Sequence, residues 1–344
     1  MKSRTFTLAI AAAATLVALV LASVGGASNQ ATIKVADVTD IGGLNDHGFN
    51  HLSYTGLQRA KKVLKVQTRV FITNTASERL PNLASAAQSN NLVFGTGFLM
   101  FDSIGKVAKQ YPKVQFAGID VPVGAVPEGK LPNLRGIVFK EQEAGYLVGY
   151  IAGLEIKRHP YKHKQIVAGV GANKVPAIEH FLAGYRAGAK KANRGVTVHL
   201  VYANDPTFND QAKCKETTLN QIGRGAGVVF EAAGGCGLGG LSAAKQKHVW
   251  GIGVDADQSY LGPHMLTSAT KKVDVGVYNT IKAYKANPSG FKGGRDFTFS
   301  VKNHGVGYGK LSSKLSASER AYLTKKVNAI QKLIASGKIV PPTK

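Results

Sequence analysis

The stretch TIKVADVTDIGGLNDHGFN, residues 32–50, joins a run rich in β-branched residues to a polar turn that contains three glycines. The run 32–38 has the length and composition of a buried strand. Residues 49–65 follow with apolar side chains near one face, as in an amphipathic helix. Because a strand followed by a helix is the start of a parallel β-α-β unit, the stretch predicts an α/β fold with polar residues after the first strand.

The same alternation recurs along the chain and predicts two similar α/β halves in tandem, each with about four strands. Further helices are expected at 265–288 and 316–339, the second with a capping box formed by Ser316 and Glu319. The strands expected in the two halves are residues 32–38, 67–73, 91–97, 114–120, 134–139, 165–171, 196–203, 226–234 and 249–257.

The N-terminus has the pattern of a secretory signal. Lys2 and Arg4 precede an uncharged apolar stretch from 6 to about 22, and small residues follow up to 27. We expect residues 1–27 to be a signal peptide; an uncleaved N-terminal anchor is the alternative. No cysteine lies in this segment, so it contains no lipobox. The sequence therefore predicts an exported protein, in the periplasm or at the outer face of the plasma membrane.

The formal net charge is +24, but the cations are scattered rather than gathered in one stripe. Lys-Lys pairs stand at 61–62, 190–191, 271–272 and 325–326, and a nucleic-acid binder would more often show a continuous basic stripe with interleaved aromatics. We therefore expect no nucleic-acid partner. His159 and His163 lie in a basic loop without an acidic neighbour, so no metal site is expected there. With only two cysteines, a disulfide scaffold is excluded.

Polar segments follow most of the expected strands. In open parallel sheets, ligands bind beyond the carboxyl ends of the strands. Two such halves facing each other would form a cleft lined by Asp, Asn, Gly and Phe, which suits a polyhydroxylated, ring-bearing small molecule. The segments are residues 39–50, 118–120, 171–173, 204–210, 232–237 and 254–257.

Two other chemistries have partial support. Gly235, Gly237 and Gly240 fit the dinucleotide pattern G-x-G-x-x-G, and Asp255 ends the next strand, but this unit is third in its half rather than first. A P-loop and the G-x-S-x-G motif of hydrolases are absent from the sequence. Carboxylates at strand ends could in principle serve a nucleoside-processing hydrolase, and this alternative stays open.

Several separate segments, taken together, resemble the basic membrane protein family, whose best-understood type is the purine nucleoside receptor of bacterial ABC transporters. The resemblance spans about residues 32–341. It rests on DIGGLNDHGFN (40–50), GLQRA (56–60), EQEAGYLVGYIAG (141–153), FEAAGGCGLGGLSAAKQK (230–247), GIGVDADQS (251–259) and TSATKKVDVGVY (267–278).

The resemblance implies a type I periplasmic-binding-protein fold, with two doubly wound lobes of parallel sheet joined by hinge crossings. Residues 31–139 would form lobe 1, completed by 264–290, and residues 140–263 would form lobe 2, completed by about 291–344. It implies a monomeric binding protein, not an enzyme, that needs no cofactor and delivers a nucleoside-like ligand to an ABC permease in the membrane. A sugar-binding or sensor protein of the same fold is the alternative.

The resemblance also implies site residues. Phe49 and Phe208 would stack on opposite faces of a purine. Asp40 and Asp120 would bind the edge of the base, and Gly234, Asp255 and Lys271 would hold the ribose. Asp46 and Asn50 would support the loop after the first strand.

The sequence departs from the family pattern at Cys214 and Cys236, where relatives commonly have small residues, and in the longer segment before Phe208. Both cysteines should lie near the carboxyl ends of neighbouring strands in lobe 2. A disulfide between them is therefore a hypothesis that a Cα separation well beyond ~7 Å would rule out.

Overall fold

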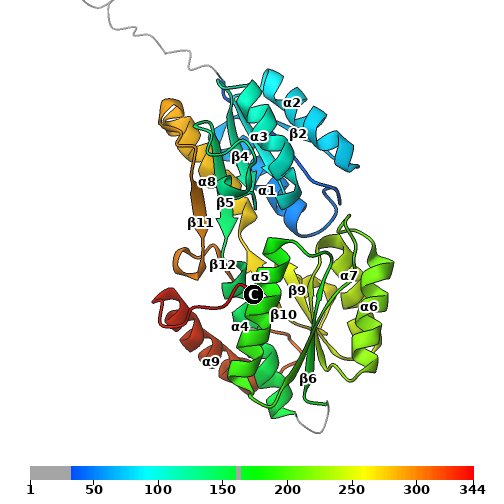
Figure 1. Cartoon of the computed structure of the whole chain (residues 1–344). Helices are drawn as coiled ribbons and strands as arrows, with labels where there is room; N and C mark the ends of the chain where they lie inside the picture. The colour runs from blue at the N-terminus through cyan, green and yellow to red at the C-terminus, as the bar shows by residue number, and fades with distance from the viewer. Residues whose placement is uncertain (1–31, 160–163) are drawn as a thin grey trace, which may run out of the picture. The chain divides into compact units, whose positions relative to one another are not determined.

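The computed structural model describes residues 32–159 and 164–344, so the expected signal peptide or anchor at 1–27 lies outside the described residues, as does His163. The described chain contains two six-stranded sheets, each covered by helices (Figure 1). Two α/β lobes are therefore present, as the alternation of strands and helices predicts. No helix among the described residues is both long enough and apolar enough to cross a bilayer.

Lobe 1 is built on an all-parallel sheet with the strand order β11-β5-β4-β3-β1-β2. Its strands are β1 (Lys34–Val38), β2 (Gln67–Phe71), β3 (Leu92–Thr96), β4 (Gln115–Ile119), β5 (Leu134–Phe139) and β11 (Asp296–Phe299). Its helices are α1 (Phe49–Leu64), α2 (Arg79–Ser89), α3 (Phe101–Gln110) and α8 (Val273–Ala286).

Lobe 2 has the strand order β12-β10-β9-β8-β6-β7, parallel except that β12 runs antiparallel to β10. Its strands are β6 (Ile166–Gly171), β7 (Thr197–Tyr202), β8 (Val228–Ala232), β9 (Trp250–Asp255), β10 (Met265–Lys271) and β12 (Val306–Tyr308). Its helices are α4 (Glu141–Arg158), α5 (Pro176–Ala192), α6 (Gln211–Gly223), α7 (Gly237–Gln246) and α9 (Ala317–Ala335).

Short 3₁₀ turns precede or follow several of these elements. The turn η4 (Gly234–Cys236) leads directly into α7, and the capping box of Ser316 and Glu319 opens α9 as predicted. The other turns are η1 (Ala76–Glu78), η2 (Phe98–Met100), η3 (Val123–Ala125), η5 (Ser259–Leu261), η6 (Pro288–Gly290) and η7 (Val301–Asn303).

The chain passes from one lobe to the other at points that differ from the expected boundaries. The segment 265–288 was expected to be helical, yet its first part is β10, whose residues are all buried and pair with β9 in lobe 2. Burial between two sheet neighbours overrides the helical reading there, and the helix α8 begins only at Val273. Likewise β11 pairs with β5, so residues 296–299 belong to lobe 1 rather than lobe 2. The described chain crosses between the sheets after β5, after β10 and after β11.

The helices α4 and α5 pack together unusually closely in lobe 2. A Cβ built on Gly149 of α4 would lie 2.1 Å from the carbonyl oxygen of Tyr185, and one on Gly184 of α5 would lie 2.1 Å from that of Gln142. Only glycine permits this approach of two backbones. The helix α4 is buried along most of its length, and it begins at the first crossing between the lobes. This packing therefore holds a helix whose first residue, Glu141, lies beside Lys271 in the wall of a cavity between the lobes.

Candidate functional site

A cavity between the lobes gathers the polar strand ends. The space between its walls, with the open solvent at its mouth included, amounts to about 730 Å³. All nine residues predicted as ligand-binding line it: Asp40, Asp46, Phe49, Asn50, Asp120, Phe208, Gly234, Asp255 and Lys271. Other lining residues are Ile41, Gly42, Gly97, Phe98, Leu99, Val175, Ala177, Ile178, Phe181, Gly235 and Val254.

The loop after β1 is held by Asp46, which caps α1 from outside the helix. Its carboxylate accepts hydrogen bonds from the backbone N–H groups of Gly48 (3.0 Å), Asn50 (2.7 Å) and His51 (3.0 Å). These donors belong to the start of the helix, where N–H groups lack intrahelical partners and favour a negative charge. Asp46 therefore stabilises the loop, and it orients Phe49 and Asn50 at the start of the helix.

Asp40 is paired with an arginine that sequence reasoning missed. The Nε of Arg79 donates to the Oδ1 of Asp40 over 2.9 Å, and the backbone N–H of Ile41 donates to the same oxygen over 2.8 Å. Burial raises the pKa of Asp40, and the Arg79 charge acts against this. Because both recorded bonds use Oδ1, the second carboxylate oxygen, Oδ2, is not engaged by them.

Lys271 lies at the centre of a buried charge network that links the lobes. Its Nζ is 2.5 Å from the Oδ2 of Asp120 in lobe 1 and 2.9 Å from the Oε1 of Glu141 in lobe 2, and the residue is only 1% exposed. His180 of α5 lies 3.2 Å from the other oxygen of Glu141. Lys271 is therefore no surface lysine, although its neighbour Lys272 completes a surface-like pair in the sequence.

Burial and charge act in opposite directions on the pKa values of this network. Burial raises the pKa of Asp120 to about 6, although Lys271 lowers it. Burial would lower the pKa of Lys271, but Asp120, Glu141 and Asp255 together hold it above its ordinary value. Burial would raise the pKa of Glu141, yet Lys271 and His180 hold it below its ordinary range. Lys271 therefore stays charged, and the cavity wall contains a fixed cation among carboxylates.

Asp255 differs from the other carboxylates because no described residue forms a hydrogen bond with its side chain. Burial raises its pKa to about 7; Lys271 lowers it, and the carboxylates of Asp120, Asp46 and Glu141 raise it further. Its backbone has φ of 62°, and Asp120 (60°) and Phe208 (57°) are likewise in the left-handed region. Such residues cost about 1–3 kcal/mol each and cluster at functional sites.

Each lobe supplies a predicted aromatic wall. The ring of Phe49 has its centroid 5.0 Å from the Nζ of Lys271, and Phe208 packs against a small buried cluster of lobe 2 that contains both cysteines. Sequence reasoning missed Phe98 and Phe181, which also line the cavity. Phe98 follows the end of β3, a position that the strand-end rule could have found, whereas Phe181 lies inside α5.

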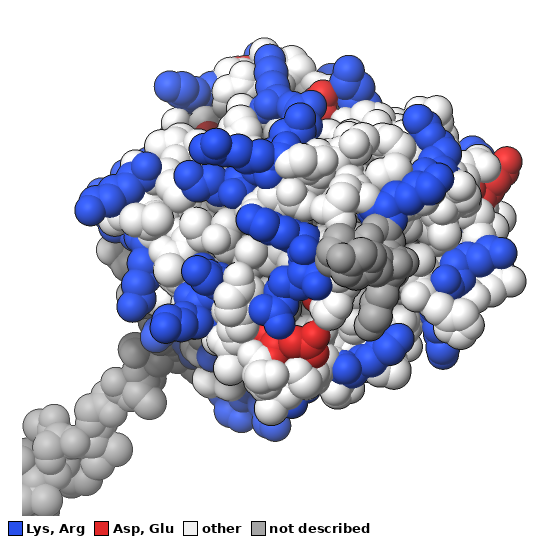
Figure 2. Space-filling model, turned by 90° about the horizontal axis from the view of Figure 1, so that it is seen from below, with Lys and Arg blue, Asp and Glu red and all other residues white. Residues whose placement is uncertain are grey.

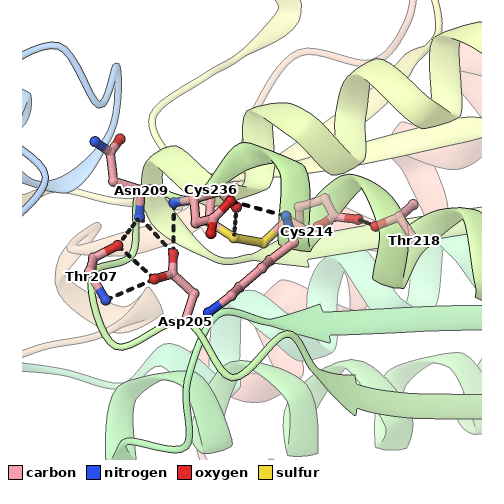
Figure 3. Close-up of a disulfide and its surroundings, with 9 residues drawn as sticks. Asp205, Thr207, Asn209, Cys214, Thr218 and Cys236 are labelled. Carbon is pink, nitrogen blue, oxygen red and sulfur yellow. Dashed lines mark hydrogen bonds between the residues drawn. A yellow bond between two sulfur atoms is a disulfide. The ribbon is translucent and has the colours of Figure 1, made fainter.

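Cys214 and Cys236 form a disulfide with their Cα atoms 5.5 Å apart (Figure 3). Cys214 lies in the first turn of α6, and Cys236 ends η4, directly after the cavity residues Gly234 and Gly235. Among residues 32–159 and 164–344, no group of three or more His, Cys, Asp or Glu side chains is arranged to hold a metal ion.

Comparison with known proteins agrees with this architecture. Residues 33–343 match the family model described as ABC transporter substrate-binding protein PnrA-like. The ABC transporter nucleoside-binding protein BmpA of Lactococcus lactis subsp. cremoris (strain MG1363) is 33% identical over 91% of this chain and 90% of its own. Basic membrane protein D of Borreliella burgdorferi (strain JD1) is 32% identical over 77% and 76%.

The fold is also found among solved structures. The ABC transporter solute-binding protein of Aeropyrum pernix K1 superimposes with a TM-score of 0.77, at 25% identity, over 91% of this chain and 94% of the other. Both lobes are therefore shared with a known solute-binding protein.

Proposed function

This chain belongs to the PnrA-like family of ABC transporter substrate-binding proteins, and from that membership together with the cavity lining we propose that it captures a purine nucleoside between its lobes. The family is one of binding proteins rather than enzymes. The observation that carries the proposal is a cavity flanked by one predicted phenylalanine from each lobe and lined by carboxylates from both.

The base would lie between Phe49 and Phe208. Aromatic rings stack on one another with a gain of about 0.5–1.5 kcal/mol beyond the area that they bury. Phe49 is the first residue of α1, and Phe208 lies on the loop between β7 and α6, so the two phenylalanines come from different lobes. A flat, aromatic ligand uses both walls, which a small polar ion would not.

The base edge would be bound by acceptors that the described protein leaves open. Asp120 Oδ1 and Asn50 Oδ1 are buried and have no hydrogen-bond partner among the described residues, and both residues line the cavity. A buried acceptor without a donor costs about 1–3 kcal/mol, so a ligand N–H that reaches it is favoured. Purines present such N–H groups on their edges.

The ribose would be bound by Gly234, Asp255 and Lys271. Asp255 offers acceptor oxygens without competition from a protein donor, and Lys271 offers a charge held in place by Asp120 and Glu141. Gly234 has φ of 55°, and its missing side chain lets the backbone approach a ligand closely. A ligand without the matching hydroxyl would leave these groups unpaired, which is the basis of selectivity.

The binding protein would act outside the cytoplasm and deliver its ligand to an ABC permease. The support is the secretory pattern at 1–27 together with family membership, and a relative is named a basic membrane protein. We propose that the protein acts as a monomer.

Mass spectrometry of the small molecules that accompany the purified protein tests the proposal. We expect an intact purine nucleoside at close to one equivalent, and no free base after long incubation with added nucleoside. A co-purifying monosaccharide would contradict the ligand assignment. Release of free base and ribose at a rate that scales with protein concentration would instead indicate a hydrolase.

A further inference from the structure

The disulfide of lobe 2 lies directly behind two parts of the cavity wall. Cys214 and Cys236 are both fully buried, and they join the start of α6 to the end of η4. The residues just before α6 include Phe208, and the residues just before Cys236 are Gly234 and Gly235, all of which line the cavity. The bridge therefore connects two cavity segments that are far apart in sequence.

Phe208 contacts the bridged segment through its backbone and its ring. Its carbonyl oxygen accepts a hydrogen bond from the backbone N–H of Cys236 over 2.9 Å. Its side chain packs against a small buried cluster that includes both cysteines, together with Ala172, Ala203 and Ala233. A Cβ on Gly234 would lie only 3.3 Å from the Phe208 carbonyl oxygen, so the two segments touch.

The loop that carries Phe208 is held at its other end by Asp205. This carboxylate accepts from the backbone N–H groups of Thr207, Asn209 and Asp210 and from the Thr207 hydroxyl, at 2.6–2.9 Å (Figure 3). Even so, Asn204 and Phe208 have φ of 53° and 57°, conformations that non-glycine residues adopt only under constraint. The Asp205 bonds close the loop around Phe208, and the disulfide follows at Cys214 in the first turn of α6.

We propose that the disulfide is a positioning element for ligand binding: it holds Phe208 against the Gly234 turn so that the second aromatic wall is preformed. The proposal rests on the proposed function, because Phe208 and Gly234 act there as ligand contacts. A preformed wall lowers the ordering cost of binding. Removing the bridge should therefore weaken ligand binding as well as stability.

The test compares the wild type with the double variant Cys214→Ala/Cys236→Ala at a temperature where both are folded. We expect the Kd for guanosine to rise about tenfold, and hydrogen exchange at the amides of Phe208, Asn209 and Cys236 to speed up in the absence of ligand. Val229→Ala is the control, because Val229 is buried in a separate cluster of lobe 2 away from the cavity. It should lower Tm and leave Kd unchanged.

A second arm separates positioning from general stability. In a Phe208→Ala background, removal of the bridge should change Kd by less than twofold, since the wall that it positions is already gone. An unchanged Kd in the double cysteine variant, or unchanged exchange at those amides, would overturn the proposal. Failure of the wild type to bind any nucleoside would overturn the proposed function, and the exchange measurement without ligand would still decide the role of the bridge.

An independent observation concerns the end of lobe 2 that lies opposite the cavity. The parallel strands β6 to β10 begin there and the helices α4 to α7 end there. Exposed cations gather at this end, which we call the far end: Lys157, Arg158, Lys164, Lys190, Lys191, Arg194, Arg224, Lys245, Lys247 and Lys314. Figure 2 views the molecule from below, toward this end, and shows Lys and Arg over much of the surface with few acidic side chains.

Helix stabilisation alone does not account for this distribution. A cation at a helix C-terminus is favoured by the helix dipole by about 0.3–1 kcal/mol. However, the helix-to-strand turns 190–196, 224–227 and 245–249 contain no Asp or Glu at all. Of the acidic residues of lobe 2, Glu141, Asp205 and Asp255 lie at the cavity end. Glu155 and Glu319 lie at the far end, beside His159. Lobe 2 thus has a far end at which exposed cations outnumber the acidic side chains.

From this charge distribution we infer that the far end of lobe 2 rests on an anionic phospholipid bilayer. Anionic headgroups complement a surface of cations, and such contacts are additive and weaken with salt. A bilayer fits better than a nucleic acid because the cations are spread over the ends of separate helices instead of forming one stripe with aromatics.

Vesicle flotation of the full chain tests this inference. The variant Lys190→Gln/Lys191→Gln/Arg194→Gln/Lys245→Gln/Lys247→Gln removes five cations from the far end. Its control, Lys61→Gln/Lys62→Gln/Lys106→Gln/Lys109→Gln/Lys113→Gln, removes five exposed cations from lobe 1. All proteins share residues 1–31, so any contribution of that segment cancels in the comparison.

On vesicles with 30% phosphatidylglycerol at 0.1 M salt, we expect partitioning of the far-end variant to fall about tenfold or more, and that of the control less than threefold. Vesicles of phosphatidylcholine alone should bind all three proteins equally. Equal losses in both variants, or none in either, would overturn the inference. Retention on duplex DNA that exceeds retention on the vesicles at the same salt would overturn it in favour of a nucleic acid.

Discussion

At the scale of single residues, the cavity contains side chains whose role depends on a partner supplied by the fold. Asp46 and Asp40 look alike in the sequence, yet Asp46 is engaged by three backbone N–H groups and Asp40 is paired with Arg79. Asp255 has no such partner among the described residues. The three aspartates therefore differ in what they can offer a ligand: Asp46 supports a loop, Asp40 has one oxygen unengaged by its recorded bonds, and Asp255 has both.

Phe49→Ala tests the first aromatic wall. Because Phe49 is only partly buried and lies against the cavity, we expect guanosine affinity to fall tenfold to a hundredfold, corresponding to about 1.5–3 kcal/mol of lost aromatic burial in the complex. The free energy of unfolding should fall by less. Phe71→Ala is the matched control, since Phe71 is half-buried on β2 away from the cavity. Calorimetry measures the affinity for guanosine, and denaturant melts measure the free energy of unfolding. A larger loss of unfolding free energy than of binding free energy would contradict the assignment of Phe49 as a ligand contact.

Lys271→Met tests the buried charge network. The variant leaves the carboxylates of Asp120 and Glu141 buried without their cation, and breaking a buried pair in this way costs about 3–5 kcal/mol. The loss should be smaller at pH 5, where the orphaned carboxylates can take up protons, than at pH 8. Urea melts at both pH values measure it. An equal loss at the two pH values would show that Lys271 acts only through its packing.

Glu231 gives the protein a pH dependence that is separate from the cavity. Burial raises its pKa to about 8, although Thr218 donates a hydrogen bond that lowers it. Between about pH 4.5 and 8 the folded state keeps a proton that the unfolded chain has lost. Its stabilising contribution is therefore complete below pH 4.5, declines as the pH rises and is lost above about 8.

Glu231→Gln removes this dependence while keeping an acceptor for Thr218. We expect the variant to gain stability relative to the wild type as the pH rises from 5 to 8.5, measured by urea melts across that range. Asp37, Asp120 and Asp255 also have raised pKa values, but they are present in both proteins and cancel in the difference. A difference that stays constant with pH would mean that Glu231 is not protonated in the folded state.

At the scale of elements, the close contact between α4 and α5 depends on glycine. Gly149→Val places side-chain atoms where the Tyr185 backbone stands, so the helices must separate and unfolding free energy should fall by about 3 kcal/mol or more. Gly223→Ala is the control, because nothing lies within 4 Å of a Cβ there. It should be neutral or slightly stabilising. Equal thermal shifts in the two variants would contradict the packing argument.

Which elements could be predicted from the sequence follows from how local their signals are. The helix α1 has apolar residues spaced along one face, and its predicted range 49–65 matches the observed range Phe49–Leu64 to within a residue. The strands β11 and β12 are four and three residues long, and they exist because distant strands pair with them. The run that forms β10 fits a helix or a strand by composition, and only its two sheet neighbours decide between them.

At the scale of the whole molecule, the position of the cavity could be predicted from one topological rule. The polar residues at strand ends of two parallel sheets converge, and so the segments that contain Asp40, Asp120, Phe208 and Asp255 could be located in advance, while the family resemblance singled out the residues themselves. Arg79, Glu141 and His180 could not. Arg79 contacts Asp40, Glu141 contacts Lys271 and His180 contacts Glu141, and these contacts join segments 39 to 130 positions apart. The lobe boundaries were also wrong in part, since a crossing leaves no local mark in the sequence.

The central claim is that a purine nucleoside is held between the lobes, and isothermal titration calorimetry of the wild type tests it most directly. Guanosine, inosine, D-ribose and D-galactose are each titrated into protein freed of small molecules. The account predicts 1:1 binding of at least one purine nucleoside with a Kd at or below about 1 μM, corresponding to about −8.2 kcal/mol, and binding of both sugars weaker by a hundredfold or more. Tight binding of a monosaccharide with no heat from either nucleoside would contradict it.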